Sequence, residues 1–333
     1  MRAVVTGSSG FIGAALSNQL LASGWEVVGI DSHSDYYAPQ LKEFRLEKLK
    51  SNPKFHFYNA DICNLKLVNQ IVKENQPNTI FHLAAQAGVR LPIESMYKYV
   101  ESNLTGFSSV LQAAVSNNVS EFLYASSSSV YGNQASIPYS EEEKNLNPNS
   151  FYGATKLSNE ILAKSIIQNS QTKSRGMRFF TVYGPMGRPD MAYFRILASL
   201  LSDSSFNLFG DGSIQRDFTF VDDCVKSVLA LQINLQTKNH GFHDVVNIGG
   251  GNPFSINDLL RVAMNLTGKK LIYETSGKNL NDALITNASS DYLFSQIGNK
   301  PTTKLEVGIQ ETINWMSEEP QRELLGKWVR SSI

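Results

Sequence analysis

A glycine-rich turn near the start of the chain constrains the fold more than any other feature. Residues Ala3–Thr6 predict a strand, and three glycines, Gly7, Gly10 and Gly13, lie at the turn from this strand into a helical pattern that begins at Phe11. Glycine permits a tight turn and a close backbone approach, and the N–H groups of a helix N-terminus attract anions. The glycines alone also fit a plain tight turn. With a strand before them and a helix after them, they are typical of a site for a dinucleotide pyrophosphate.

The first half of the chain alternates between short β-branched runs and longer amphipathic stretches. This alternation predicts the α/β class, with a Rossmann-type, doubly wound parallel sheet and crossover helices. The expected strands are Ala3–Thr6, Glu26–Ile30, Phe55–Asn59, Thr79–Leu83, Phe122–Ala125 and Met177–Thr181. The expected helices are Phe11–Leu21, Leu65–Lys73, Tyr99–Val115 and Tyr152–Ile167, where apolar residues recur at spacings of three and four.

After Thr181 the pattern loosens into turns rich in proline and glycine around shorter elements. We expect a smaller, mixed α/β C-terminal lobe that binds the substrate. Phe218–Leu231 looks helical and Val245–Ile248 looks like a strand, so the chain is expected to return to the first sheet. The predicted division is a dinucleotide-binding domain at 1–182, joined by 217–248, and a second lobe at 183–216 and 249–333.

Charge and cysteine content exclude several classes of function. Thirty Lys and Arg balance thirty Asp and Glu, so no overall field would recruit nucleic acid or an anionic membrane. The two cysteines are too few for a disulfide framework, and the histidines form no ligand set, so we expect no metal. The first apolar run breaks at Gly7, unlike a signal peptide, and no later stretch is long enough to span a bilayer. We expect a cytoplasmic protein.

An aspartate at the end of the second expected strand indicates which dinucleotide is bound. Asp31 lies about 20 residues beyond the glycines. At that position a carboxylate hydrogen-bonds the adenosine ribose and repels a 2′-phosphate. NAD is therefore favoured over NADP.

A tyrosine and a lysine at the start of a predicted helix form the candidate catalytic pair. Tyr152 and Lys156 are four residues apart, which places the phenol and the ammonium on one face of the helix. An unperturbed tyrosine ionises near pH ~10, so a tyrosine base needs roughly 4 kcal/mol of help near neutrality. The ammonium supplies part of that help. Such pairs also occur by chance on solvated helices, but the glycine turn upstream favours the catalytic interpretation.

Four consecutive serines, Ser126–Ser129, follow the fifth expected strand. A serine run is often no more than a flexible loop. Ligands of α/β proteins, however, bind beyond the carboxyl ends of the strands. We therefore expect these hydroxyls to face a ligand.

These motifs resemble those of the extended short-chain dehydrogenase/reductases over nearly the whole chain. The wide glycine spacing, the Tyr152/Lys156 pair and Val130-Tyr131-Gly132 after the serines carry the resemblance. It implies that Ser127 hydrogen-bonds the reacting hydroxyl, beside Tyr152 and Lys156. It also implies that NAD contacts Gly7, Gly10, Phe11, Ile12, Gly13, Asp31, Asp61, Ile62, Leu83, Ala84, Ala85, Gln86, Asn103, Tyr152, Lys156 and Tyr183.

Within that family the chain is most similar to the UDP-glucuronate 4-epimerases. The segments that carry this similarity include Asp35-Tyr36-Tyr37, Ala87-Gly88-Val89-Arg90 and Gly187-Arg188-Pro189-Asp190-Met191. The resemblance implies UDP-sugar contacts from Arg90, Ser127, Ser128, Ser129, Thr181, Arg188, Arg216 and Asp282. The arginines suit this role because a guanidinium binds phosphate oxygens bidentately. There are two departures: Met186 replaces an expected aromatic residue, and Ser289 stands where an acidic residue often follows the alanine.

The resemblance implies a redox-neutral isomerase. UDP-glucuronate would become UDP-galacturonate through a transient 4-keto sugar, with tightly bound NAD. Alternatives are a UDP-glucuronate decarboxylase, another UDP-sugar 4-epimerase or a 4,6-dehydratase. Related decarboxylases carry a Glu, and dehydratases resemble Thr-Asp-Glu, where this chain has Ser127, Ser128 and Ser129.

A further alternative belongs to a different class of protein. A catalytically dead relative would bind NAD as a scaffold, but intact Ser127, Tyr152 and Lys156 argue against it. Homodimers are usual in the family. The resemblance places the dimer contact on the predicted helices Tyr99–Val115 and Tyr152–Ile167.

Overall fold

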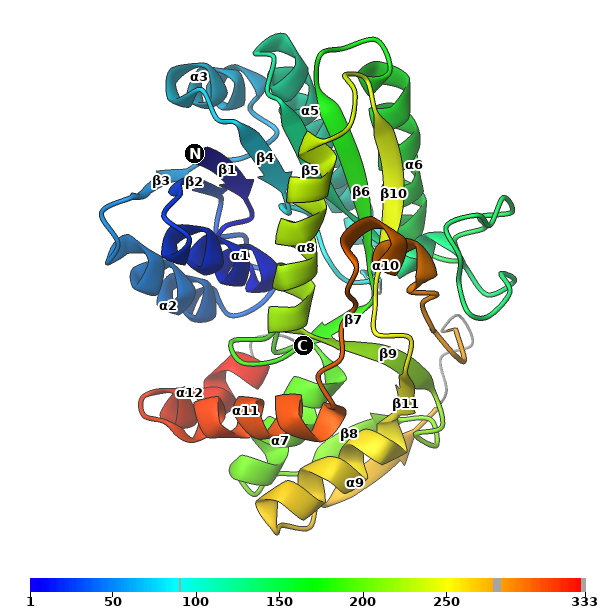
Figure 1. The fold of residues 1–333 in the computed structure, drawn as a ribbon. Helices are drawn as coiled ribbons and strands as arrows, with labels where there is room; N and C mark the ends of the chain where they lie inside the picture. The colour runs from blue at the N-terminus through cyan, green and yellow to red at the C-terminus, as the bar shows by residue number, and fades with distance from the viewer. Residues whose placement is uncertain (90, 278–282, 331–333) are drawn as a thin grey trace.

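The computed structural model describes residues 1–89, 91–277 and 283–330. Its largest element is a seven-stranded parallel sheet with the order β10-β6-β5-β4-β1-β2-β3 (Figure 1). The strands are β1 (Arg2–Thr6), β2 (Glu26–Asp31), β3 (Phe55–Asn59), β4 (Thr79–His82), β5 (Glu121–Ser127), β6 (Lys173–Phe179) and β10 (His243–Ile248). The predicted Rossmann-type fold class is confirmed.

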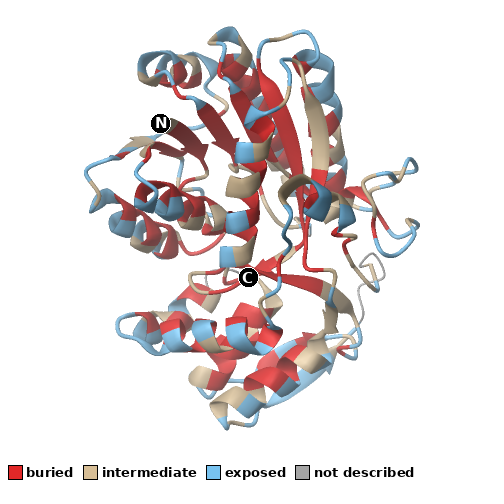
Figure 2. Ribbon diagram, viewed as in Figure 1, coloured by how far each residue is buried: buried red, intermediate tan, exposed pale blue. Residues whose placement is uncertain are grey.

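Helices cover both faces of this sheet because its strands are apolar on both faces. Along β1, Ala3 and Val5 join one buried cluster while Val4 joins the other. The first cluster includes residues of α1 (Phe11–Ala22), α2 (Pro39–Lys50) and α8 (Val221–Gln236). The second includes residues of α3 (Leu65–Asn75), α5 (Phe107–Ser116) and α6 (Phe151–Ile167). The central strands are therefore buried on both sides (Figure 2).

A smaller mixed lobe lies below the carboxyl ends of the main strands in Figure 1. Its three-stranded sheet has the order β11-β9-β7, and β8 pairs with β12 in a separate ribbon. The strands are β7 (Thr181–Tyr183), β8 (Phe206–Phe209), β9 (Gln215–Phe220), β11 (Pro253–Ser255) and β12 (Tyr273–Ser276). The helices α7 (Ala192–Leu201), α9 (Ile256–Thr267), α11 (Leu305–Ser317) and α12 (Gln321–Arg330) pack there, while α10 (Asp291–Ile297) packs on β10.

The structure corrects several predicted boundaries. The expected strand Met177–Thr181 is two strands, because the chain leaves the main sheet at Phe180 and β7 pairs with β9 instead. The first three residues of the expected helix Phe218–Leu231 belong to β9. The sequence analysis also did not predict α2, which begins with a proline at its first turn.

The expected helix Tyr99–Val115 is not one regular α-helix. It begins as α4 (Tyr97–Tyr99), continues as the π-helical η2 (Val100–Gly106) and becomes α5 only at Phe107. Two short 3₁₀ turns, η1 (Ile93–Ser95) and η3 (Ser128–Val130), complete the elements. π-Helical turns are frequent at functional sites.

The described residues contain neither a membrane-spanning helix nor a cluster of metal ligands. No helix in those ranges is long and apolar enough to cross a membrane. No group of three or more His, Cys, Asp or Glu side chains among the same residues is placed to hold a metal ion.

Candidate active site

The glycine turn connects β1 to α1 and is stabilised by backbone contacts. Gly7 N donates to Ile30 O at 2.8 Å, and Gly10 N donates to Gly7 O at 2.9 Å. Gly7 has a φ of +71°, and a Cβ added at Gly13 would lie 2.0 Å from Gly7 O. Only glycine fits these two positions. No side chain caps α1 at Gly10, so its first N–H groups are available to an anion.

Asp31 ends β2 beside this turn. Its carboxylate accepts hydrogen bonds from Ser9 N at 3.0 Å and from His33 N at 2.9 Å. Because Ser9 lies within the glycine turn, Asp31 both braces the turn and carries a negative charge next to it. Lys42 is buried nearby, where burial lowers the pKa of its ammonium and the charge of Asp31 opposes that effect.

The segment after β4 connects the glycine turn to the catalytic helix. Leu83 N donates to Thr6 O, and Gln86 N donates to the side-chain oxygen of Asn103 at 2.8 Å. The amide of Asn103 in turn donates to the hydroxyl of Thr155, on α6, at 3.1 Å. Asn103 lies in the π-helical segment and is 1% exposed. The predicted residues 83–86 and Asn103 therefore lie together.

Tyr152 and Lys156 lie on the first turns of α6. This helix begins where the hydroxyl of Ser150 accepts a hydrogen bond from Gly153 N at 3.0 Å. The Lys156 ammonium lies 5.8 Å from the centre of the Tyr152 ring and donates to Ala125 O at 3.0 Å. The bond to Ala125 fixes the cation against the end of β5.

Burial changes the pKa of both groups. It lowers the pKa of Lys156 to about 8. Removal from water raises the pKa of Tyr152, while the charge of Arg188 and a hydrogen bond with Ser127 lower it. The sequence analysis assigned charge assistance to Lys156 and the cofactor, and did not identify Arg188 as a cation acting on Tyr152.

The serine run begins in β5 and ends in the 3₁₀ turn η3. Ser127 is buried and its hydroxyl accepts a hydrogen bond from Ser129 N at 3.1 Å, which caps the turn. Ser127 also donates to the Ser129 hydroxyl at 3.2 Å. Ser128 and Ser129 are partly exposed. The Ser127 hydroxyl, which hydrogen-bonds Tyr152, therefore lies at the carboxyl end of a central strand.

Three predicted substrate residues lie on the connecting strands and turns. Thr181 begins β7 and is partly exposed. Arg188 forms an ion pair with Asp190, in which Nε donates to Oδ1 at 3.0 Å. Arg216, on β9, donates to Ala283 O at 2.8 Å. Arg90 and Asp282, which were also predicted to contact the UDP-sugar, lie outside the described residues.

Some predicted cofactor residues lie apart from this group. Tyr183 is fully buried in an aromatic cluster with Tyr193, Phe218 and Phe220, so its side chain is part of the core of the small sheet. Asp61 and Ile62 follow β3. Asp61 is exposed and accepts from Cys63 N at 2.8 Å, while Ile62 is buried.

Met186 and Ser289 make local contacts in the structure. Met186 has a φ of +57°, unusual for a residue with a side chain, and its carbonyl accepts two hydrogen bonds from Arg45 on α2. Arg45 also donates to Ser9 O, so it connects the glycine turn to the segment before Arg188. Ser289 N donates to Tyr139 O at 2.8 Å.

Two buried polar residues at the ends of β1 and β4, Thr6 and His82, were not identified from the sequence. Thr6 Oγ1 accepts from Ala84 N at 3.2 Å and lies 2.8 Å from His82 Nδ1. Thr6 and His82 therefore share a buried hydrogen bond, and burial lowers the pKa of His82 to about 3. Thr6 ends the predicted strand Ala3–Thr6, and His82 is the second-last residue of the predicted strand Thr79–Leu83. A polar residue near the carboxyl end of an apolar strand was the available signal.

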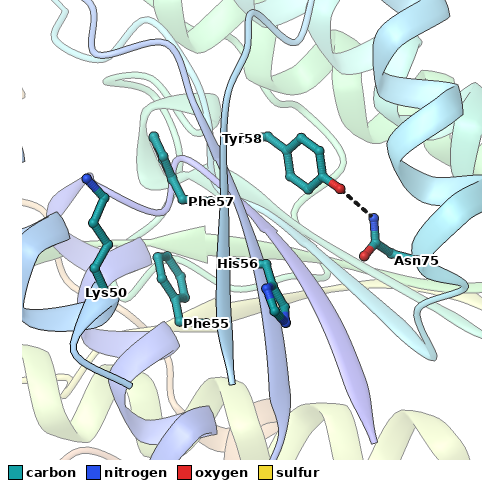
Figure 3. A pocket seen from close by; sticks show the side chains of 6 residues that line it. All are labelled: Lys50, Phe55, His56, Phe57, Tyr58 and Asn75. Carbon is teal, nitrogen blue, oxygen red and sulfur yellow. Dashed lines mark hydrogen bonds between the residues drawn. The ribbon is translucent and has the colours of Figure 1, made fainter. Parts of the chain in front are cut away.

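A surface hollow elsewhere contains none of the candidate residues. It lies at the edge strand β3 and is lined by Lys50, Phe55, His56, Phe57, Tyr58 and Asn75 (Figure 3). Successive side chains of the strand point to its two opposite faces, so the hollow spans the strand's edge and does not enclose a ligand volume.

The fold and these side chains define a dinucleotide-binding enzyme with a paired tyrosine and lysine. A family model described as the NAD dependent epimerase/dehydratase family matches residues 3–249. The chain belongs to this family, and the family resemblance inferred from the sequence is confirmed.

Individual relatives match over almost their whole length. A UDP-glucuronate 4-epimerase of Thermodesulfobacterium geofontis is 36% identical over 316 residues, which cover 95% of this chain and 96% of the relative. Protein CapI of Staphylococcus aureus is 35% identical, with 96% and 99% covered. A crystal structure of the UDP-glucuronic acid 4-epimerase of Bacillus cereus, in complex with UDP-glucuronic acid and NAD, has a TM-score of 0.87 at 33% identity, with 95% and 99% covered.

Proposed function

We propose that this protein is an NAD-dependent isomerase that inverts C4 of a UDP-hexuronic acid, converting UDP-glucuronate to UDP-galacturonate. The observation that carries the proposal is the grouping of Ser127 with Tyr152 and Lys156, which lie on a helix that Asn103 and residues 83–86 connect to the glycine turn. The named activity of the relatives from T. geofontis and B. cereus supports the same reaction.

The turn after β1 fits a dinucleotide. A Cβ at Gly13 would clash with Gly7 O, so the backbone there stays bare and a pyrophosphate can approach it closely. We propose that the N-terminus of α1, Asp31, residues 83–86 and Asn103 hold the cofactor. When bound, NAD accepts and returns the C4 hydride, and its positive nicotinamide ring favours a nearby phenolate.

Tyr152 takes the proton of the sugar's O4 hydroxyl. Ser127 hydrogen-bonds the same hydroxyl and so aligns it with the phenol. Lys156, fixed by Ala125 O, provides positive charge beside the ring. Arg188 adds a second positive charge that opposes the effect of burial on Tyr152.

We propose that the serines and Thr181 hold the carboxylate of the uronate. Oxidation at C4 makes a β-keto acid, which loses CO2 when the carboxylate aligns with the carbonyl π system. Hydroxyls donate charge-assisted hydrogen bonds that hold a carboxylate still. The guanidinium groups of Arg90, Arg188 and Arg216, together with Asp282, are proposed to hold the UDP part.

The decisive experiment is product analysis with UDP-glucuronate, UDP-glucose and UDP-N-acetylglucosamine side by side, without added reductant. We expect UDP-galacturonate from UDP-glucuronate, with little pentose product and poor use of the other two sugars. UDP-pentose as the main product would favour the decarboxylase. A preference for UDP-glucose would contradict the assignment of a uronate as the substrate. Bound NAD without turnover of any sugar would favour a scaffold.

One substitution separates the epimerase from the decarboxylase. Ser129→Glu places a like charge beside the carboxylate, so we expect weaker uronate binding or a larger decarboxylated fraction. Mass spectrometry of the products measures that fraction. Ser204→Glu, at an exposed serine after α7, is the control and should leave the product ratio unchanged. Equal product ratios and KM values in both variants would contradict the proposed role of the serines.

We also propose a domain division, an oligomeric state and a cellular compartment for the protein. We propose that residues 1–182 with 217–248 form the cofactor domain, supported by the pairing of β10 with β6, and that 183–216 with 249–333 form the sugar lobe. Two of these boundaries fall inside β7 and β9, the strands through which the chain passes to the small sheet. The protein is proposed to act as a cytoplasmic homodimer. Large exposed apolar side chains on α6, namely Ile161, Leu162 and Ile166, support a contact through that helix.

A further inference from the structure

A buried ion pair lies one helical turn beyond the candidate catalytic residues. Glu160 is on α6, four residues after Lys156, and Arg178 is on β6. Arg178 donates from Nε to Glu160 Oε1 at 2.9 Å and from Nη2 to Oε2 at 2.7 Å. Their side chains are 3% and 7% exposed. A bidentate pair of this kind fixes the orientation of both groups as well as their separation.

Arg178 keeps its charge in this buried position. Burial acts to lower the pKa of Arg178, but the hydrogen bonds and the charge of Glu160 outweigh burial and raise it overall. A buried ion pair is weak support for stability, because desolvation offsets much of the attraction. Its position beside the catalytic turn therefore calls for an explanation other than stability alone.

Glu160 also contacts the strand that leads to the serine run. The hydroxyl of Ser126 donates to Glu160 Oε1, and both groups are buried. Ala125, one residue earlier, accepts the hydrogen bond from Lys156, and Ser127, one residue later, contacts Tyr152. Three consecutive residues of β5 are thus bonded to α6.

Arg178 extends the same contacts toward the sugar lobe. Its Nη1 donates to the Tyr131 hydroxyl at 2.9 Å, and that hydroxyl donates to Asn247 Oδ1 at 2.8 Å. The amide of Asn247 donates to Tyr139 O at 2.9 Å, and Ser289 N donates to the same carbonyl at 2.8 Å. The ion pair therefore bonds, through buried groups, to the segment before α10.

We propose that Glu160, held by Arg178 and bonded to Ser126, is a positioning residue: it fixes α6 against β5 so that Tyr152 and Ser127 reach the same sugar hydroxyl. The inference rests on the proposed epimerase function. It assigns no chemistry to Glu160 itself, which acts only through the helix and the strand that it connects. A displacement of about 1 Å at a reacting group costs up to roughly 100-fold in rate.

The same strand provides a matched control pair. Arg175, three residues before Arg178, donates from Nε and the adjacent Nη2 to the carboxylate of Asp244 on β10, each at 2.7 Å. The Arg175 and Asp244 side chains are 0% and 13% exposed. This pair has a similar geometry and burial, but its further hydrogen bonds join it to α8, through Leu231 O and Asn234, and to Tyr292 on α10.

The experiment compares Glu160→Gln, Ser126→Ala and Asp244→Asn as full chains loaded with NAD. For each we measure the Tm, kcat and KM for UDP-glucuronate, and the pH dependence of kcat. We expect Glu160→Gln to lower kcat about 10- to 100-fold while KM changes by less than about 3-fold. The pH at half-maximal kcat should rise, because a displaced Tyr152 receives less help from Lys156 and Arg188. Ser126→Ala should show the same changes to a smaller degree, and Asp244→Asn should lower the Tm while kcat and the pH profile stay unchanged.

The outcomes separate the positioning role from a structural one. A folded Glu160→Gln with the wild-type kcat and pH profile would overturn the proposal, as would equal kcat losses in Asp244→Asn. If Glu160→Gln does not fold, Ser126→Ala decides, and wild-type values for it would overturn the proposal. Absence of epimerisation in the wild type would refute the proposed function, a result that the variants cannot produce.

Discussion

At the scale of single residues, the hydroxyl of Tyr152 is under opposing influences. Its removal from water raises its pKa, and Arg188 together with Ser127 lowers it. Burial lowers the pKa of the Lys156 ammonium to about 8, which is close to neutral pH. The phenol of Tyr152 is therefore protonated at neutral pH in the chain alone, and the bound cofactor's charge has to complete its activation.

Tyr152→Phe removes only the hydroxyl. Because that hydroxyl is the proposed proton acceptor, turnover should fall by about 10²- to 10⁴-fold while the fold and bound NAD are retained. Lys156→Ala should also lose activity, with its residual rate shifted to higher pH. Steady-state kinetics and the NAD content of the purified protein measure both effects. Near-normal turnover in Tyr152→Phe would show that Tyr152 is not the base.

His82 should make stability sensitive to acid. Its pKa is about 3 in the folded chain against an ordinary value of 6.5, because burial opposes the charged form. Between these values the unfolded chain binds a proton that the folded chain does not, so stability falls as pH drops below about 6.5, by up to roughly 1.4 kcal/mol per pH unit. Above that pH the group contributes no pH dependence.

The variant His82→Gln tests this. Its urea-unfolding free energy should change less between pH 7 and pH 5 than that of the wild type, by about 2 kcal/mol. His240→Gln, at an exposed histidine, is the control and should behave like the wild type. An unchanged pH dependence in His82→Gln would show that His82 does not account for the acid sensitivity.

At the scale of elements, the N-terminus of α6 combines a structural and a catalytic role. The hydroxyl of Ser150 accepts from Gly153 N, the residue next to Tyr152. Ser150→Ala should destabilise the protein by about 1 kcal/mol because it leaves that N–H without its cap. Ser255→Ala, at the capped N-terminus of α9, should cost a similar amount.

Only Ser150→Ala should also lower kcat, since only α6 carries Tyr152. Denaturant unfolding and steady-state kinetics on the two variants test this directly. Equal kcat values in both would show that the first turn of α6 keeps its geometry without the cap.

Helix and strand patterns predicted which elements of the main sheet occur along the chain better than they predicted where each element ends. Apolar spacing identified α1, α3, α5 and α6, but it continued one strand past Phe180 and began α8 three residues early. Both errors occur where the chain passes to the small sheet, because pairing with β9 is a long-range contact that no local pattern contains. The sequence pattern also did not predict the π-helical turn around Asn103, because the apolar residues there keep a helical spacing.

In the candidate site, too, long-range contacts could not be predicted from local sequence patterns. The glycine turn, Asp31 and the Tyr152/Lys156 pair depend on neighbours in sequence and were identified directly. The Glu160–Arg178 pair, the Thr6–His82 bond and the bonds from Arg45 to Met186 and Gly187 join residues that are 18 to 142 positions apart. A lone buried arginine or glutamate in the sequence does not reveal its partner, so these contacts required the folded chain.

At the scale of the whole molecule, the main strands direct their carboxyl ends toward the smaller lobe (Figure 1). Arg45, on α2, bonds the carbonyls of Met186 and Gly187 in the segment that leads to that lobe. Asp217, on β9, accepts from Gly250 N, Gly251 N and Ala288 N, where the chain passes between β10 and the lobe. The connections between the two parts are therefore held by buried polar groups as well as by apolar packing.

The outer face of α6 gives the last prediction. Ile161 is 62% exposed on α6, and Ile233 is 62% exposed on α8, on the opposite face of the sheet. If the proposed homodimer forms through α6, Ile161→Glu should bury an unpaired charge in the contact and shift the protein to the mass of one 36.9 kDa chain. Ile233→Glu places the same charge on a face outside the proposed contact, so it should leave the assembly intact. Light scattering after size exclusion, over a range of protein concentrations, measures both masses. A dimer that persists in Ile161→Glu, or a wild type that is monomeric throughout, would contradict the contact through α6 while leaving the chemistry at Tyr152 untouched.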